Sequence, residues 1–416
     1  MVKVRRFAGW AVALLALALL VGACGREEGS GGGGGGGGGS DPGITDTEIK
    51  LGGSYPFSGP ASAYRSIADG AKAHFDFVNA KGGVGGRKIS FQTLDDAYEP
   101  PKAVSNARRL IEQEQVFALF NTLGTPNNLA IWDYTNQRKV PQTYVATGAS
   151  SFGSDIQAHP WTIGWQPNYV TEAKIYADYL KEEKPGAKVA VLYQNDGFGK
   201  DLLGGFEAAL KGTDIQLVAK ESYEVTDPTI TSQIRTLAGS GADTFINITT
   251  PKFSAQAIAA IAKSDWKPLH ILNNVGASKT LVLTPVGLEN AKGIVSTQYF
   301  KDPDDPQWAD DAAMTEYKEN LKKYAPKADP NEPFNAYGWA AAQTMVKAIE
   351  GMKEPTRQAL MDSIRNLDTE IPMLLPGIKV QTAPDDGFPI EAMQIMQFDG
   401  ENWKLQGDVI EATASN

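Results

Sequence analysis

Residues 49–93 read IKLGGSYPFSGPASAYRSIADGAKAHFDFVNAKGGVGGRKISFQT and contain one complete strand, helix and strand. The β-type run Ile49–Gly53 is followed by a turn at Ser58-Gly59-Pro60, and the glycine-rich segment 81–86 ends the helix that comes next. One face of that helix is apolar, at Ile67, Ala71, Phe75 and Val78, and the following strand alternates Ile89, Phe91 and Thr93. This order of elements predicts parallel strands under a covering helix.

The same alternation repeats along the chain in two series of similar size. The first continues with a strand over 116–121, a helix over 126–137 and a strand over 143–146. The second is predicted to contain the helices 170–180, 199–211, 230–237 and 254–263 and the strands 189–193, 216–221, 244–248 and 269–272. After Gly293 come a strand over 294–299, helices over 309–324, 335–350 and 357–366, and a β-rich tail at 378–380, 393–398 and Trp403. We expect two α/β domains that the tail completes.

The amino terminus has the features of a secretory signal. Three cations precede an apolar run over 7–21, and small residues stand directly before Cys24. The run is shorter than the roughly 20 residues that a membrane-spanning helix needs. We expect residues 1–23 to be removed and a lipid on Cys24, the only cysteine, to be the sole membrane contact. The Arg5-Arg6 pair resembles a twin-arginine signal, but its flanking residues fit poorly, so the export route stays open.

Residues 24–46 are predicted to form a tether. Gly29 to Ser40 contains only glycine and serine, with nine consecutive glycines over 31–39. Such a composition cannot bury a core and behaves as a random coil, of which about 16 residues reach roughly 20–25 Å. The folded body is therefore expected to lie near a membrane without contacting it.

The charge balance argues against nucleic acid as a partner. The whole chain has 39 Lys and Arg against 49 Asp and Glu, a net charge of −10. Removal of residues 1–23 takes away three cations and leaves 36 against 49, or −13. An acidic surface repels phosphate groups, and no basic stretch stands out. With Cys24 modified, no disulfide can form, and burial must stabilise the exported protein.

No motif in the sequence combines the residues that a catalytic site or a cofactor site needs. The glycine cluster 82–86 follows a helix, whereas a dinucleotide loop follows a strand, and the segment 276–280 lacks the spacing of a phosphate loop. The three histidines are far apart and lack metal-ligand spacing. The acidic segment 302–311 lacks the spacing of a calcium loop and is interpreted as a solvated loop. The sequence therefore predicts no cofactor, no metal site and no enzyme.

Polar and aromatic residues recur where the predicted strands end. Taken singly, each group is equally well explained as a turn or a helix cap. Their recurrence matters because ligands of open α/β sheets bind outside the carboxyl ends of the strands. The groups are Ser58-Gly59-Pro60 with Tyr64, Leu123-Gly124-Thr125, Thr147-Gly148-Ala149-Ser150, Asp196-Gly197-Phe198-Gly199, Thr249-Thr250-Pro251 and Asn273-Asn274.

The most specific motifs are Ser58-Gly59-Pro60 with Tyr64, Asn79 to Val84, Asp95-Asp96, Ala146 to Ser150 and Tyr193 to Lys200. With them the chain resembles, over residues 49–407, the leucine/isoleucine/valine-binding family of type I periplasmic solute-binding proteins, the receptors of ATP-driven importers. The resemblance implies the α/β type I periplasmic-binding-protein fold, in which two doubly wound parallel-sheet lobes are joined by a three-crossover hinge and close on one small ligand without catalysis. Lobe I is then expected over 47–165 and 293–375, and lobe II over 166–292 and 376–416.

The resemblance also implies where a ligand binds. The carboxylate of the ligand is then expected near residues 123–125, Gly148 and Ser150. Tyr64 and Phe198 are expected to line the pocket for its side chain. The full expected set is Ser58, Tyr64, Leu123, Gly124, Thr125, Gly148, Ala149, Ser150, Phe198, Thr249, Thr250, Asn273, Asn274 and Tyr299.

Two departures from the family stand out. Its disulfide in the first lobe is absent, because Tyr98 and the Leu123 region occupy those places. Where the family has the acidic residue that pairs with an amino acid's ammonium, this chain has Asn273-Asn274. An unpaired ammonium in a closed site is costly. We therefore expect an acid without an α-amine, an aromatic carboxylate in particular, ahead of a branched-chain amino acid, which Asp196 could rescue as a substitute partner.

The expected function is that of an extracytoplasmic, lipid-anchored and monomeric binding protein, at the outer face of the membrane or in the periplasm. It would deliver a small carboxylate to the permease and ATPase of an ABC importer. The alternative is a ligand-sensing receptor domain of the same fold.

Overall fold

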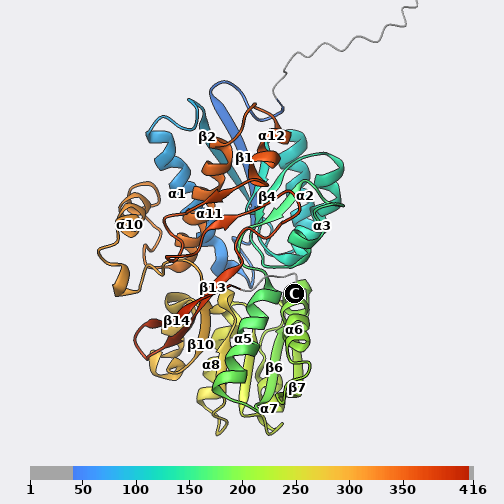
Figure 1. Ribbon diagram of the computed structural model, residues 1–416, viewed down its shortest axis with the longest axis vertical. Coiled ribbons are helices and arrows are strands. Elements are labelled where there is room, and N and C mark those ends of the chain that lie inside the picture. The colour runs from blue at the N-terminus through green and yellow to red at the C-terminus, as the bar shows by residue number, and fades with distance from the viewer. Residues whose placement is uncertain (1–40, 412–416) are drawn as a thin grey trace, which may run out of the picture. The chain divides into compact units, whose positions relative to one another are not determined.

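The computed structural model describes residues 41–411 (Figure 1). The predicted signal peptide, the lipid on Cys24 and nearly all of the glycine-rich tether lie outside the described residues. Residues 41–411 form α-helices and two large β-sheets, so the α/β prediction is confirmed. In this part of the chain no helix combines the length and the apolar character needed to cross a membrane.

A five-stranded parallel sheet comes from the first series, in the order β2-β1-β3-β4-β5. Its strands are β1 Glu48–Tyr55, β2 Lys88–Asp95, β3 Ala118–Phe120, β4 Gln142–Val145 and β5 Thr162–Gly164. Every residue of β3 and β4 is buried, as expected for parallel strands between two helical layers. The helices around this sheet are α1 Ser66–Ala80, α2 Pro100–Arg108, α3 Thr125–Gln137, α4 Ser151–Ser154, α10 Ala312–Tyr324, α11 Pro333–Glu350 and α12 Arg357–Ile364.

A seven-stranded sheet comes from the second series and the tail, in the order β14-β13-β10-β9-β8-β6-β7. Its strands are β6 Lys188–Gln194, β7 Gln216–Tyr223, β8 Thr244–Ile248, β9 Leu269–Leu272, β10 Val295–Gln298, β13 Ala392–Phe398 and β14 Trp403–Glu411. Strands β6 to β10 pair in parallel, whereas β13 and β14 add an antiparallel pair at one edge. Its helices are α5 Tyr169–Glu183, α6 Gly197–Ala209, α7 Thr231–Ala238, α8 Pro251–Ala262 and α9 Thr284–Val286.

The chain passes between the two sheets three times, after β5, after β10 and before β13. The second passage corrects the boundary expected at residue 293. Strand β10 pairs with β9 on one side and with β13 on the other, so residues up to Gln298 belong to the seven-stranded sheet. The small two-stranded ladder of β11 Asp368–Thr369 and β12 Val380–Gln381 precedes the third passage. That the two halves move as separate lobes stays a prediction.

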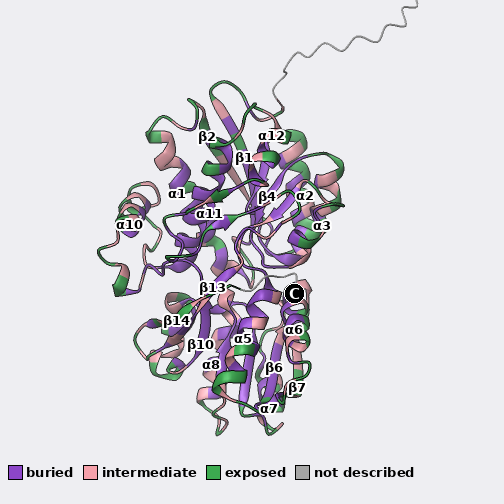
Figure 2. Cartoon of the chain, viewed as in Figure 1, coloured by how far each residue is buried: buried purple, intermediate pink, exposed green. Residues whose placement is uncertain are grey.

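Helices α1 and α11 pack with their backbones in close approach. A Cβ at Gly70 would lie 1.9 Å from the Asn335 carbonyl oxygen, and a Cβ at Gly338 would lie 1.9 Å from that of Ile67. Only glycine fits at such a crossing. Almost every residue of α11 is buried, and Figure 2 shows the buried residues running along the strands of both sheets. Helix α11 therefore completes the core around the five-stranded sheet.

Candidate functional site

One cavity lies where the carboxyl ends of strands from both sheets meet. On the side of the five-stranded sheet, Tyr64 of the short helix η1 (Ser62–Arg65) and the segment 123–125 between β3 and α3 line it. On the other side lie Phe198 of α6, Asn274 after β9 and Tyr299 after β10. The space open to the centre of a water-sized sphere is about 60 Å³. This is several times what one water needs, so the cavity suits a small ligand.

Eight of the fourteen residues that we expected at the ligand line this cavity: Tyr64, Leu123, Gly124, Thr125, Phe198, Thr250, Asn274 and Tyr299. They come from both sheets, and the cavity brings them together from distant parts of the sequence. Their contact with a ligand stays a prediction.

Three expected residues instead stabilise the turns that follow their strands. The Ser58 hydroxyl donates to Asp95 Oδ2 at 2.6 Å, and its amide to Asp95 Oδ1 at 3.2 Å. The Thr249 hydroxyl donates to Asn247 Oδ1 at 2.7 Å. Asn273 Nδ2 donates to the carbonyl oxygens of Asn247 and Thr249 at 2.9 and 2.8 Å. None of the three lines the cavity, so here the turn explanation holds.

The segment Gly148, Ala149 and Ser150 also lies away from the cavity lining. The amide and hydroxyl of Ser150 both donate to the Asp201 carboxylate, each at 2.8 Å, and so join this loop to α6. The ring of Tyr169 covers Gly148 closely, because a Cβ there would lie 2.8 Å from it. The donors that the resemblance assigned to a carboxylate at Ser150 are therefore used within the protein.

Eight aromatic side chains line the cavity. Tyr64, Tyr98, Phe334 and Tyr337 belong to the side of the five-stranded sheet, and Tyr169, Phe198, Tyr299 and Phe300 to the other side. The ring centroids of Tyr64 and Phe334 are 5.0 Å apart, as are those of Tyr169 and Phe198. Burial raises the pKa of Tyr64 and Tyr98 well above the usual value of tyrosine, so both hydroxyls stay protonated. The walls thus suit an apolar body flanked by hydrogen-bonding hydroxyls.

Helix α3 begins at the cavity. Its N-cap is Gly124, whose φ of +97° lies in the left-handed region that glycine adopts readily. A Cβ at this position would lie 2.7 Å from the Tyr98 ring. The first N–H groups of a helix have no carbonyl partner within it, and with the helix dipole they favour an anion. The Thr125 hydroxyl, 2.6 Å from that of Thr147, adds a polar group, so this wall suits a carboxylate.

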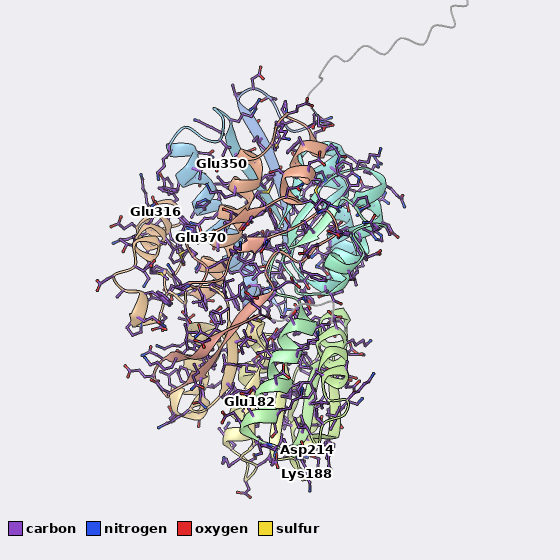
Figure 3. The ribbon with its side chains drawn as sticks, in the orientation of Figure 1. Glu182, Lys188, Asp214, Glu316, Glu350 and Glu370 are labelled. Carbon is purple, nitrogen blue, oxygen red and sulfur yellow. The ribbon has the colours of Figure 1, made fainter. Side chains whose placement is uncertain are left out.

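Among the described residues that line the cavity, Asp302 alone carries a carboxylic acid or a basic group. It is 7% exposed, and burial raises its pKa to about 7. The interpretation of segment 302–311 as a solvated loop is therefore wrong for Asp302 and Asp305, which are both buried. The sequence held one signal, since Asp302 closely follows a predicted strand and the pair Tyr299-Phe300. By contrast, the charged residues labelled in Figure 3 are exposed or half-exposed, and none lines the cavity.

Two further acidic residues contact residues that line the cavity but do not line it themselves. Glu172 of α5 accepts hydrogen bonds from the Asn274 amide at 2.6 Å and from the Tyr176 hydroxyl at 2.7 Å, and burial raises its pKa to about 7. Asp196 caps α6, accepting from the amides at 198 and 199 at 3.0 and 3.2 Å. Neither lines the cavity, so each acts by positioning its neighbours. Within residues 41–411 no group of three or more metal-binding side chains is assembled.

Comparisons with known proteins agree with one another. The profile of the family described as periplasmic binding protein matches residues 48–402. The Leu/Ile/Val-binding protein homolog 7 of Brucella suis biovar 1 (strain 1330) is 26% identical over 336 residues, which cover 78% of this chain and 82% of the relative. A branched chain amino acid ABC transporter structure from Thermus thermophilus with bound valine has a TM-score of 0.79 at 14% identity, covering 89% of this chain and 98% of that one. A fatty acid ABC transporter substrate-binding protein from Thermomonospora curvata has a TM-score of 0.73 at 21% identity, covering 90% and 95%.

At these identities the solved structures show the fold, and they confirm the predicted two-sheet architecture of type I periplasmic binding proteins. The family consists of binding proteins rather than enzymes, and its members act outside the cytoplasm. Since the family profile spans nearly all of the described residues, this chain belongs to the periplasmic binding protein family, within which its curated relatives are homologues of the Leu/Ile/Val-binding protein.

Proposed function

We propose that this chain is the solute-binding component of an ABC importer and that it captures a small carboxylate in the cavity between the two sheets. The observation that carries the proposal is the convergence of both sheets on one cavity with eight aromatic side chains, at which α3 begins. The aromatic walls would hold the apolar body of the ligand, and the start of α3 would hold its carboxylate.

The size of the cavity supports a compact ligand. The cavity is small, with about 60 Å³ of free space by the measure given above. This size favours a ligand as large as an amino acid or a benzoate over a long acyl chain. Among the related structures, one is named with bound valine and another as a fatty acid carrier. For this chain, we propose a ligand of the size of an amino acid or a benzoate.

Capture would proceed by closure of two lobes. Contacts with a ligand that touches both sheets are all made only when the lobes are together, so the ligand shifts the equilibrium toward the closed form. The permease would then recognise that form. Small-angle scattering should show a smaller radius of gyration at ligand saturation, whereas an unchanged profile would contradict closure.

Matched acids and amides test the carboxylate. Leucine, isoleucine, valine, phenylalanine, benzoate and 4-hydroxycinnamate are each compared with their primary amides by thermal shift. A true ligand at about 100 times its Kd stabilises the folded state by about 2.7 kcal/mol, or roughly 5 °C or more in Tm. We expect at least one acid to do so and its amide to fail, because the amide lacks the negative charge that the start of α3 favours. Equal shifts by an acid and its amide, or no shift with any acid, would contradict the proposal.

A further inference from the structure

The aspartate pair Asp95-Asp96 stands at the end of β2, and neither residue lines the cavity. Asp96 is nevertheless fully buried. One oxygen of its carboxylate accepts the hydroxyl of Ser54 at 2.6 Å, and the other accepts the amide N–H of Tyr98 at 2.8 Å. Asp95 accepts the amide N–H of Ala97 at 2.9 Å. Both carboxylates therefore bind the backbone of the turn formed by Ala97 and Tyr98.

This turn has an unfavourable backbone conformation. Ala97 and Tyr98 have φ values of +51° and +63°, in the left-handed region. The Cβ atom makes this region costly for residues other than glycine, so such a residue stays there only where its surroundings hold it. Here two of them follow one another, and a carboxylate accepts the amide N–H of each. The two aspartates thus offset the cost of the turn.

A hydrogen-bond network supports the carboxylate of Asp96. The Ser54 hydroxyl that donates to it accepts from Asn106 Nδ2 of α2 at 3.0 Å. Asn106 Nδ2 also donates to the carbonyl oxygen of Asp95 at 3.0 Å. Burial raises the pKa of Asp96, and the bonds from Ser54 and Tyr98 lower it in part. Asp96 therefore connects the turn to β1 directly and to α2 through Ser54.

The turn places the ring of Tyr98 in the wall of the cavity. This ring lies against the start of α3, because a Cβ at Gly124 would lie 2.7 Å from it. The Tyr98 hydroxyl reaches the other side, where it donates to Asp196 Oδ2 and accepts from Gln194 Nε2, both at 3.4 Å. These distances are long for hydrogen bonds, so a small movement of the ring would break them. The position of Tyr98 therefore affects both the shape of the cavity and a contact between its two sides.

We propose that Asp96 is a positioning residue for ligand binding, which holds the turn 97–98 so that Tyr98 presents its ring to the ligand. The inference rests on the proposed function, because it needs a ligand in this cavity, and it adds a residue outside the lining that acts on affinity through Tyr98. Asp95 supports the same turn, and its carboxylate also accepts the Ser58 hydroxyl, so it connects the turn to the segment after β1. Without Asp96 the turn relaxes, the ring of Tyr98 moves, and the cavity loses one of its walls.

Titration calorimetry on single and combined variants tests the inference. Leucine, phenylalanine, benzoate and 4-hydroxycinnamate are titrated into wild type, Asp96→Asn, Tyr98→Ala and the double variant. Asparagine keeps the size of the side chain and loses the charge that strengthens both hydrogen bonds. For the acids that bind wild type, we expect Asp96→Asn to weaken binding about three- to tenfold and Tyr98→Ala about ten- to a hundredfold. The double variant should bind like Tyr98→Ala, because Asp96 acts through that side chain.

The double variant separates positioning from a general effect on the fold. If Asp96→Asn lowers affinity by the same factor with and without Tyr98→Ala, or does not lower it at all, the inference fails. Asp243→Asn is the matched control. Asp243 also accepts a hydroxyl, that of Thr244, and a backbone amide N–H, that of Lys188, but it directly precedes β8, at the end of the strand away from the cavity. This control should leave every affinity unchanged.

Ser54→Ala keeps the inference falsifiable if Asp96→Asn does not fold. It removes the hydroxyl that donates to Asp96 and leaves the acid in place, so affinity should fall about two- to fivefold, and only when Tyr98 is present. If the acids bind wild type and neither variant changes their affinity, the inference fails and the proposed function stands. If the primary amides bind as tightly as the acids and depend on Asp96 and Tyr98 in the expected way, the inference stands and the carboxylate function fails. Binding of none of the four acids to wild type would overturn both.

Discussion

The hydroxyl of Tyr64 donates a hydrogen bond of 2.9 Å to the carbonyl oxygen of Val275. Tyr64 belongs to the segment after β1, and Val275 to the turn after β9, so this bond joins the two sheets across the cavity that both residues line. The ring of Tyr64 packs on that of Phe334, which lies on its own side of the cavity. If the two sides close on a ligand as proposed, this bond can form only in the closed arrangement.

Tyr64→Phe should weaken ligand binding without weakening the fold. The substitution keeps the ring and removes a bond that exists only when the two sides meet, worth about 0.5–1.5 kcal/mol, so affinity should fall roughly two- to tenfold. Calorimetry with the best ligand from the thermal-shift panel measures it. Tyr324→Phe, at a half-exposed tyrosine outside the cavity, is the control. Equal affinity of wild type and Tyr64→Phe would show that the bond does not contribute to closure.

Phe198→Ala should reduce affinity by about 1–3 kcal/mol, because it removes an apolar wall of the cavity. Phe198 is 2% exposed and packs on Tyr169, so the variant will also lower Tm. Phe77→Ala separates the two effects, since Phe77 packs on His74 and Trp339 and does not line the cavity. Phe77→Ala should lower Tm with unchanged affinity. If Phe198→Ala behaves in the same way, Phe198 is a core residue only.

Stability without ligand should fall as pH rises, in part through Glu172. Its pKa is raised from 4.5 to about 7 by burial, so between these values the folded state binds more protons than the unfolded state and the free energy of unfolding decreases with pH. Such a shift corresponds to on the order of 3 kcal/mol. This decrease in the free energy of unfolding is absent below pH 4.5 and complete above about pH 7.

Glu172→Gln tests this contribution. The amide oxygen of glutamine can accept the bonds that Asn274 and Tyr176 donate to Oε1, and the buried charge is gone. The variant should melt roughly 5 °C higher than wild type at pH 8 and like wild type at pH 4.5. Glu182→Gln, at an exposed residue of the same helix, should change neither value. A Glu172→Gln curve parallel to that of wild type would contradict the assignment.

Cys24→Ser should release the protein from the membrane. The lipid on Cys24 is the only membrane attachment that the sequence predicts, so its removal should move the protein to the soluble fraction. Fractionation of expressing cells checks this. Ser30→Ala, in the predicted tether, should remain with the membrane. Membrane association of Cys24→Ser at the level of wild type would rule out the lipid as the anchor.

The sequence predicted those elements whose apolar pattern is long or sharply bounded. The strand expected over 269–272 is β9 without change, because an apolar run ends there at polar Asn273. Helix α2 was missed, since its buried residues are only Ala103 and Ala107, and β5 was missed because it has three residues. Short elements and small buried side chains carry too little periodicity to be recognised.

Part of the cavity lining could be predicted from the sequence, and part could not. The start of α3 and Tyr64 follow strands directly, and the rule that ligands lie beyond strand ends locates them. Asp302 was assigned to solvent because charged residues that interact with it, such as Lys279 and Glu332, are far away in the chain. Ser150 was assigned to the ligand because its bonds to Asp201 cannot be read from its own segment.

The glycine contacts between α1 and α11 have a consequence for the order in which this chain can acquire its structure. The partner of Gly70 is the backbone of Asn335, and between them lies the whole of the seven-stranded sheet except β13 and β14. While the ribosome is still making residues 81–332, α1 can pack on the first sheet through Phe75, but the side of α1 that carries Gly70 still lacks α11 and stays uncovered. A fragment that stops before residue 333 should therefore aggregate or be degraded, although it contains every strand of that sheet.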